Sequence, residues 1–130
     1  MTIIGHEEIE FSPFYWIKNV NDIKNTPPNS VVIFSKDDNY SLMMNHCKKN
    51  NITFANEVKS INQALISSAN NASFLVVSDM YLAKKLQDIA NNYLFDAKII
   101  LRIKSDEELE NAAISNIDGV IFPNGEILNG

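Results

Sequence analysis

Residues 74–103 read FLVVSDMYLAKKLQDIANNYLFDAKIILRI, and this stretch decides the fold class. Two apolar runs, Phe74–Val77 and Lys98–Ile103, flank a segment from about Met80 to Leu94 whose apolar residues recur at helical spacing. Short apolar runs bounded by polar residues are typical of strands buried on both faces, and a helix between two such strands connects them in parallel. The stretch therefore predicts a strand, a helix and a second, parallel strand.

The same alternation continues on both sides of this stretch, from Ser30 to the end of the chain. Ser60 with Gln63, and Ser105 with Glu108, have the spacing of capping boxes at helix starts. Further strands are predicted at residues 31–34, 52–55 and 120–122, and further helices at residues 39–50, 61–70 and 105–117. We expect an α/β domain over residues 30–130 with a doubly wound, five-stranded parallel sheet in the order 2-1-3-4-5.

Residues 1–29 do not repeat this unit and are interpreted as an N-terminal extension that packs on the domain. Ile9–Phe11 alternates like a strand, and Trp16–Lys24 is spaced for a short helix that we expect beside the first helix of the domain. Four aromatic residues fall close together here, and they pack either on this sheet or on a partner. They are Phe11, Phe14, Tyr15 and Trp16.

Composition bounds the functional classes. The 130 residues are 45% hydrophobic, which suits one domain with an ordinary core. Because 16 acidic residues face 11 basic ones and Arg102 is the single arginine, general nucleic-acid binding is excluded. No apolar run is long enough to span a bilayer, and the single cysteine, Cys47, has no internal disulfide partner. We therefore expect a cytoplasmic protein that does not bind membranes.

Polar residues follow each predicted strand, at the edge of a parallel sheet where ligands bind. Asp37, Asp38 and Asp79 carry the oxygen ligands that Mg²⁺ prefers, but Asp and Ser are equally what helix starts require, so the N-cap interpretation is favoured. Helix N-termini are also suited to a small anion. The candidate ligand-binding residues are Ser35, Asp37, Asp38, Ser78, Asp79 and Asn124.

Motifs for cofactor chemistry are missing from the predicted loops. None of the strand-to-helix connections is rich in glycine, which argues against dinucleotide and P-loop sites. Cys47 and His46 are neighbours on a helix, where adjacent side chains point about 100° apart, so they do not form a catalytic pair. One cysteine and two distant histidines exclude an ordinary zinc site. We expect no cofactor, no metal and no catalytic residues, and we interpret Cys47 as a core residue.

The stretch from Val31 to Pro123 resembles a response-regulator receiver domain, which has the flavodoxin-like strand order given above. The resemblance is carried by NEVKSINQAL at residues 56–65, FLVVSDM at residues 74–80 and DGVIFP at residues 118–123. It implies that Asp79 occupies the place of the phosphoacceptor. The acidic pair of the family falls on Ser35 and Lys36, and its final lysine on Phe122, which argues against Mg²⁺-dependent phosphoryl transfer, and phosphorylation of Asp79 stays open as a third alternative.

Two functions follow as expectations. The first is a non-catalytic, receiver-like regulatory or protein-interaction domain that forms a homodimer through the aromatic segment or an exposed helix face. The alternative is a small enzyme, or a protein that binds a small molecule or anion, with its site at the carboxyl ends of the strands.

Overall fold

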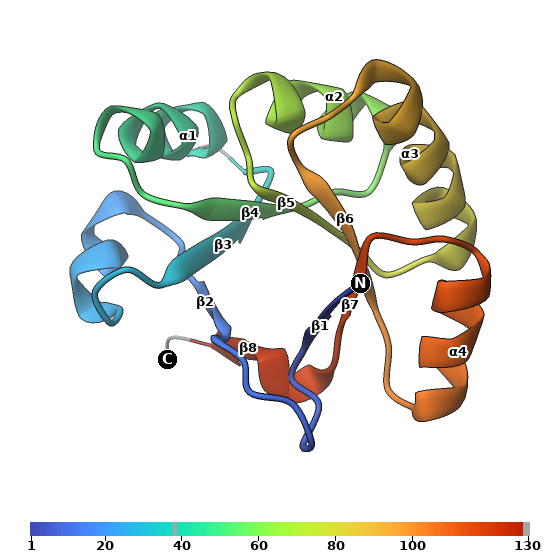
Figure 1. Cartoon of the computed structure of the whole chain (residues 1–130). Coiled ribbons are helices and arrows are strands. Elements are labelled where there is room, and N and C mark those ends of the chain that lie inside the picture. Colours follow the sequence, from blue (N-terminus) through green and yellow to red (C-terminus); the bar gives the residue numbers. More distant parts are fainter. Residues whose placement is uncertain (38, 129–130) are drawn as a thin grey trace.

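A computed structural model describes residues 1–37 and 39–128. Within them, eight strands pair in parallel to form one sheet in the order β1-β7-β6-β5-β4-β3-β2-β8 (Figure 1). The strands are β1 (Thr2–Ile4), β2 (Phe14–Trp16), β3 (Val31–Ser35), β4 (Phe54–Glu57), β5 (Phe74–Val77), β6 (Lys98–Arg102), β7 (Gly119–Ile121) and β8 (Glu126–Leu128).

The helices lie between consecutive strands, and η1, α2, α3 and α4 begin at polar side chains that cap them. Ser60 and Ser105 accept hydrogen bonds from the backbone N–H groups of Gln63 and Glu108, so the two predicted capping serines are confirmed. None of the helices within the described residues has the length and apolar character to cross a membrane. The helices are η1 (Val20–Asn25), α1 (Tyr40–Lys49), α2 (Ile61–Ala69), α3 (Met80–Tyr93), α4 (Asp106–Ile114) and η2 (Pro123–Gly125), where η denotes a 3-10 helix.

The sheet curls into an open half-barrel, with α1 to α4 on its convex side (Figure 1). Alternate residues of each strand point to opposite faces, so one set faces into the half-barrel. This set forms an inner core made of strand residues alone, and Trp16, Val31 and Phe74 pack against it. The inner core consists of Ile4, Phe14, Ile33, Ala55, Val76, Ile100 and Ile121.

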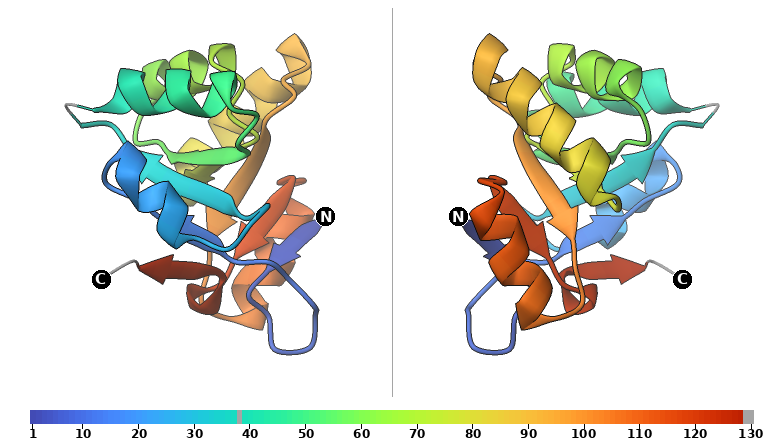
Figure 2. Two further views of the ribbon diagram at one scale, coloured as in Figure 1. Left: turned by 90° about the vertical axis from the view of Figure 1, so that its left-hand side faces the viewer. Right: turned by 90° about the vertical axis from the view of Figure 1, so that its right-hand side faces the viewer.

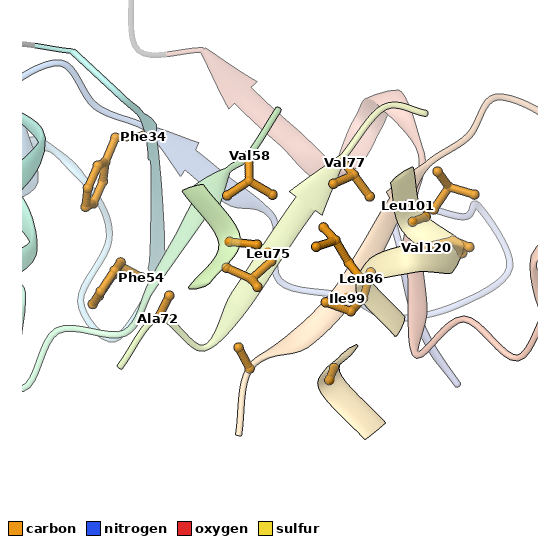
Figure 3. Close-up of a cluster of buried hydrophobic side chains, with 14 of the residues drawn as sticks. Phe34, Phe54, Val58, Ala72, Leu75, Val77, Leu86, Ile99, Leu101 and Val120 are labelled. Atoms are coloured by element: carbon orange, nitrogen blue, oxygen red, sulfur yellow. The ribbon is translucent and has the colours of Figure 1, made fainter. Parts of the chain in front are cut away.

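The opposite set of strand residues packs against the helices as a larger outer core (Figure 3). Leu75, Val77 and Ile99 from the central strands contact Leu86 and Ala83 of α3 within this cluster, and each is completely buried. Burying a side chain of this size stabilises the fold by about 1.5–3 kcal/mol. The two cores hold the curled sheet from both sides and so fix the position of its carboxyl-terminal edge.

The structure corrects the predicted number and order of strands. The α/β class and the parallel sheet are confirmed, but the sheet has eight strands instead of five. The five strands predicted from the pattern are β3 to β7, and they lie in sequential order, whereas the order 2-1-3-4-5 contains a reversal. Without that reversal the chain winds in one direction only, and α1 to α4 all join one cluster on one face.

The three additional strands come from the two ends of the described chain. The predicted helix at Trp16–Lys24 is wrong, because Phe14–Trp16 forms β2 and only Val20–Asn25 is helical. β1 and β8 form the two edges of the sheet (Figure 2). Directly after β1, Gly5 packs against η2, where an added Cβ would lie 2.6 Å from the backbone nitrogen of Gly125. β1 and β2 are therefore strands of the same sheet as β3 to β8.

Candidate functional site

The carboxyl ends of the strands carry a ring of polar side chains above the inner core. Side chains two positions apart on a strand point to the same face. The residues two positions after the inner-core residues Ile33, Ala55, Val76 and Ile100 therefore also face into the half-barrel. We call this ring the mouth layer. Its members are Trp16, Ser35, Glu57, Ser78 and Arg102, which end or directly follow β2 to β6, together with Glu126, the first residue of β8, which accepts from Trp16 and Arg102.

Arg102 on β6 is the centre of the mouth layer. Its Nε and Nη2 donate to the two carboxylate oxygens of Glu126 on β8, at 2.8 and 2.7 Å. Its Nη1 donates to the carboxylate of Glu57 on β4 and, at 3.0 Å, to the hydroxyl of Ser78. Trp16 on β2 donates from Nε1 to Glu126 at 2.9 Å, and its ring centre lies 5.9 Å from the guanidinium carbon of Arg102. One guanidinium thus joins four strands.

The charged groups of this network are half-buried and compensate one another. The side chains of Arg102, Glu57 and Glu126 are 25%, 17% and 15% exposed. Burial alone would lower the pKa of the Arg102 guanidinium, but hydrogen bonds and charge attraction from Glu126 and Glu57 raise it above its ordinary value. Arg102 therefore stays charged and fixes both carboxylates in place.

A pocket of about 540 Å³ opens beside Arg102, and we call it the mouth pocket. Its inner wall is formed by Ile121 and Pro123, and its rim by Lys104 and Glu108. Glu108 accepts from the backbone N–H of Lys104 at 3.2 Å, which fixes the loop between β6 and α4. The complete lining is Ser78, Arg102, Ile103, Lys104, Glu108, Ile121, Pro123 and Glu126.

The residues predicted for a ligand site are only partly brought together. Ser78 lines the mouth pocket, and Ser35 lies in the mouth layer opposite Glu57 in the strand register. Asp79 is the N-cap of α3 and accepts from the N–H of Leu82 at 2.9 Å. Asp37 accepts from the N–H of Asn39 at 2.8 Å. Both aspartates thus have the local role that their position at a helix start favours.

Of the two remaining predicted ligand-binding residues, the structure describes Asn124, which does not line the mouth pocket. Asn124 is exposed on η2 and lines a shallower pocket with His6, Lys104 and Asp106. Asp38 lies outside the described residues. Among the residues described, no three His, Cys, Asp or Glu side chains are placed to hold a metal ion.

The aromatic segment divides between the core and the surface. Phe14 is 1% exposed and packs within the inner core against Phe74, with ring centres 4.9 Å apart. Trp16 is half-buried in the mouth layer. Phe11 is 38% exposed and Tyr15 is partly exposed, so these two are accessible to a partner and Phe14 is not.

Sequence reasoning missed Glu57, Arg102, Lys104 and Glu126 as members of one site. One signal was present, because Arg102 is the single arginine of the chain and falls at the end of a predicted strand. No comparable signal marked Glu126, since the three-residue strand that carries it is too short to produce a periodic pattern.

Comparison with known proteins adds no relative to this description. No model of a known protein family matches the chain, and no curated protein matches it. The site is therefore interpreted from its own geometry.

Proposed function

We propose that the protein binds a small anionic organic molecule in the mouth pocket, with Ser78 and Lys104 as its principal polar contacts. The observation that carries this proposal is the Arg102 network. Four of the five guanidinium donors are used by Glu126, Glu57 and Ser78, so this network forms a fixed, polar floor to the pocket. Pockets at the carboxyl ends of parallel strands are where α/β proteins bind small molecules.

Ser78 supports the proposal through its hydrogen-bonding state. Its Oγ accepts a hydrogen bond from Arg102, and its own proton is then left to donate toward the pocket. A hydroxyl held in this way is a pre-oriented donor for a carboxylate or phosphate oxygen. The exposure of Ser78 leaves this donor accessible to a ligand.

Lys104 supplies the charge. Two basic and two acidic side chains line the pocket, and Arg102 is already paired with both Glu126 and Glu57. Within the described part of the chain, the ammonium of Lys104 forms no ion pair, whereas a carboxylate oxygen of Glu108 is engaged by the backbone N–H of Lys104 and by Ser105. Lys104 is therefore the cation with which an anionic group of a ligand would pair, and a volume of about 540 Å³ suits a small metabolite.

The test is a titration with small anions, followed by the amide signals of Ser78 and Lys104 in NMR spectra. Inorganic phosphate, malate and citrate are the probes, and ethanolamine is the cationic counterpart. We expect saturable shifts with at least one anion, a weakening of about tenfold in S78A, and no weakening in S35A, which removes the neighbouring serine of the mouth layer. Equal affinity in S78A and S35A, or equal binding of ethanolamine, would contradict the proposal.

Self-association is the second candidate function, and edge strand β8 favours it. β8 pairs with β2 on one side only, while Ile127 and Leu128 are 39% and 78% exposed. Open strand edges with apolar side chains are suited to pairing with another chain. Tyr15 lies in β2, and Phe11 precedes this strand by three residues. We expect the variants F11S and L128S to lower the molecular mass of the protein in size-exclusion chromatography with light scattering. A monomeric wild type would reject this candidate.

A further inference from the structure

A second pocket lies on the convex side of the sheet, between α3 and α4, and we call it the interhelix pocket. Its volume is about 420 Å³. Met80 and Lys84 are spaced four residues apart on α3, and Asn111 and Ser115 are spaced four apart at the end of α4, so each pair presents one helix face to the pocket. Ser78, Arg102 and Glu108 border both this pocket and the mouth pocket.

One wall of the interhelix pocket is apolar and open. It is formed by Met80, Leu101 and Ile114. Ile114 is 79% exposed, which is unusual for a large aliphatic side chain that lines a pocket. A ligand with a short hydrocarbon chain would cover this wall and remove Ile114 from water, which favours binding.

The other wall carries one cation without an acidic partner. In the described part of the chain, Lys84 makes no ion pair, and the side chains of Asn111 and Ser115 form no hydrogen bonds. Glu108 is the acidic residue of this wall, and its Oε1 is held by the backbone N–H of Lys104 and by the Ser105 hydroxyl. The neighbouring Lys85 lies outside the pocket, with its ammonium 4.3 Å from the ring centre of Tyr81.

We infer that the interhelix pocket binds a monocarboxylic acid with a short apolar chain. The carboxylate lies against the ammonium of Lys84, within reach of the amide and hydroxyl donors of α4. The hydrocarbon chain lies on Met80, Leu101 and Ile114. Met80, Lys84 and Ile114 line this pocket and not the mouth pocket, so the inference is tested independently of that proposal.

The experiment is a titration of the full chain with octanoate, followed by the methyl signals of Met80 and Ile114 in NMR spectra. Octylamine, with the same chain and the opposite charge, is the ligand control. K84Q is the test variant and K85Q is the matched control, because both remove one charge from the same turn of α3. I114A tests the apolar wall without changing the charge.

We expect octanoate to shift both methyl signals saturably and octylamine to leave them unchanged. K84Q should weaken binding by about threefold to fivefold, I114A by several-fold, and K85Q by less than about twofold. Equal weakening by K84Q and K85Q would overturn the assignment to Lys84. The absence of saturable shifts in the wild type, or equal binding of octylamine, would overturn the inference itself.

Discussion

Arg102 and Glu126 form a two-pronged ion pair in which Nε and Nη2 of the guanidinium donate to the two carboxylate oxygens at 2.8 and 2.7 Å. The pair joins β6, near the centre of the sheet, to β8 at its edge. Bidentate pairs are geometrically specific as well as strong. The Arg102–Glu126 ion pair therefore holds β8 at the mouth of the half-barrel and shapes the mouth pocket beside it.

Replacing Glu126 by alanine should release β8. The variant leaves the half-buried guanidinium of Arg102 with fewer acceptors and also removes the acceptor of the Trp16 indole. We expect E126A to lower the free energy of unfolding by about 1–3 kcal/mol in urea titrations, with faster amide exchange at Ile127 and Leu128. E107A, which removes an exposed carboxylate, should change neither quantity by more than about 0.5 kcal/mol. Equal effects of the two variants would refute the proposed role of Glu126.

Gly5 should tolerate no larger residue. Its φ of +92° is a conformation that side chains disfavour, and an added Cβ would lie 2.6 Å from the backbone nitrogen of Gly125. We expect G5A to destabilise the fold by more than about 2 kcal/mol, since both the backbone of Gly5 and its contact with η2 must shift. S12A, in the exposed loop that follows β1, is the control. A near-neutral G5A would show that Gly5 and η2 are not in close contact.

Leu94 should be replaceable with a gain in stability. It ends α3 with a φ of +54° and is 84% exposed, so it combines backbone strain with little burial. The other non-glycine residues with positive φ in the described chain are all asparagine, the residue that adopts this conformation most readily after glycine. We expect L94N to raise the midpoint of thermal unfolding by several degrees, which corresponds to an increase of about 1 kcal/mol in the free energy of unfolding. Y93N, one residue earlier with helical backbone, should give no such rise.

Cys47 should behave as an inert core thiol. Burial raises its pKa from 9.0 to about 11, and its side chain is completely buried. Above pH 9 the unfolded chain loses the thiol proton of Cys47, whereas the native state keeps it. The stability that the protonated thiol contributes is therefore present at neutral pH and falls between pH 9 and 11. We expect slow reaction with Ellman's reagent at pH 8 until urea unfolds the protein. Fast labelling of the native protein would place Cys47 outside the core.

Most helices and strands were predictable because each depends on a hydrophobic pattern within one short stretch of sequence. The helices α1 to α4 and the strands β3, β5, β6 and β7 lie close to the expected positions. β4 was placed two residues too early, at 52–55 instead of Phe54–Glu57, because polar Asn56 and Glu57 interrupt the apolar pattern. Asn56 is fully buried and donates to backbone carbonyls, and Glu57 faces Arg102. The residues that build the site thus obscured the strand that carries them.

Strand order could not be predicted, since it depends on long-range packing. Both the sequential order and the order 2-1-3-4-5 alternate strands with helices and bury apolar residues on both faces of each strand. In this chain the inner face is covered by the opposite side of the curled sheet, and a doubly wound sheet would cover it with helices. The three additional strands, β1, β2 and β8, contain three residues each, which is too few for a periodic pattern.

The most direct test of the central claim is native mass spectrometry of the protein purified under mild conditions from its own cells. Ligand binding in the mouth pocket predicts a non-covalent small-molecule adduct on the wild type that is lost from S78F, in which the larger side chain would fill the pocket. A dimer without any adduct would contradict this account and favour self-association through β8. A bare monomer, or an adduct that S78F retains, would contradict a ligand site at Ser78 and Arg102.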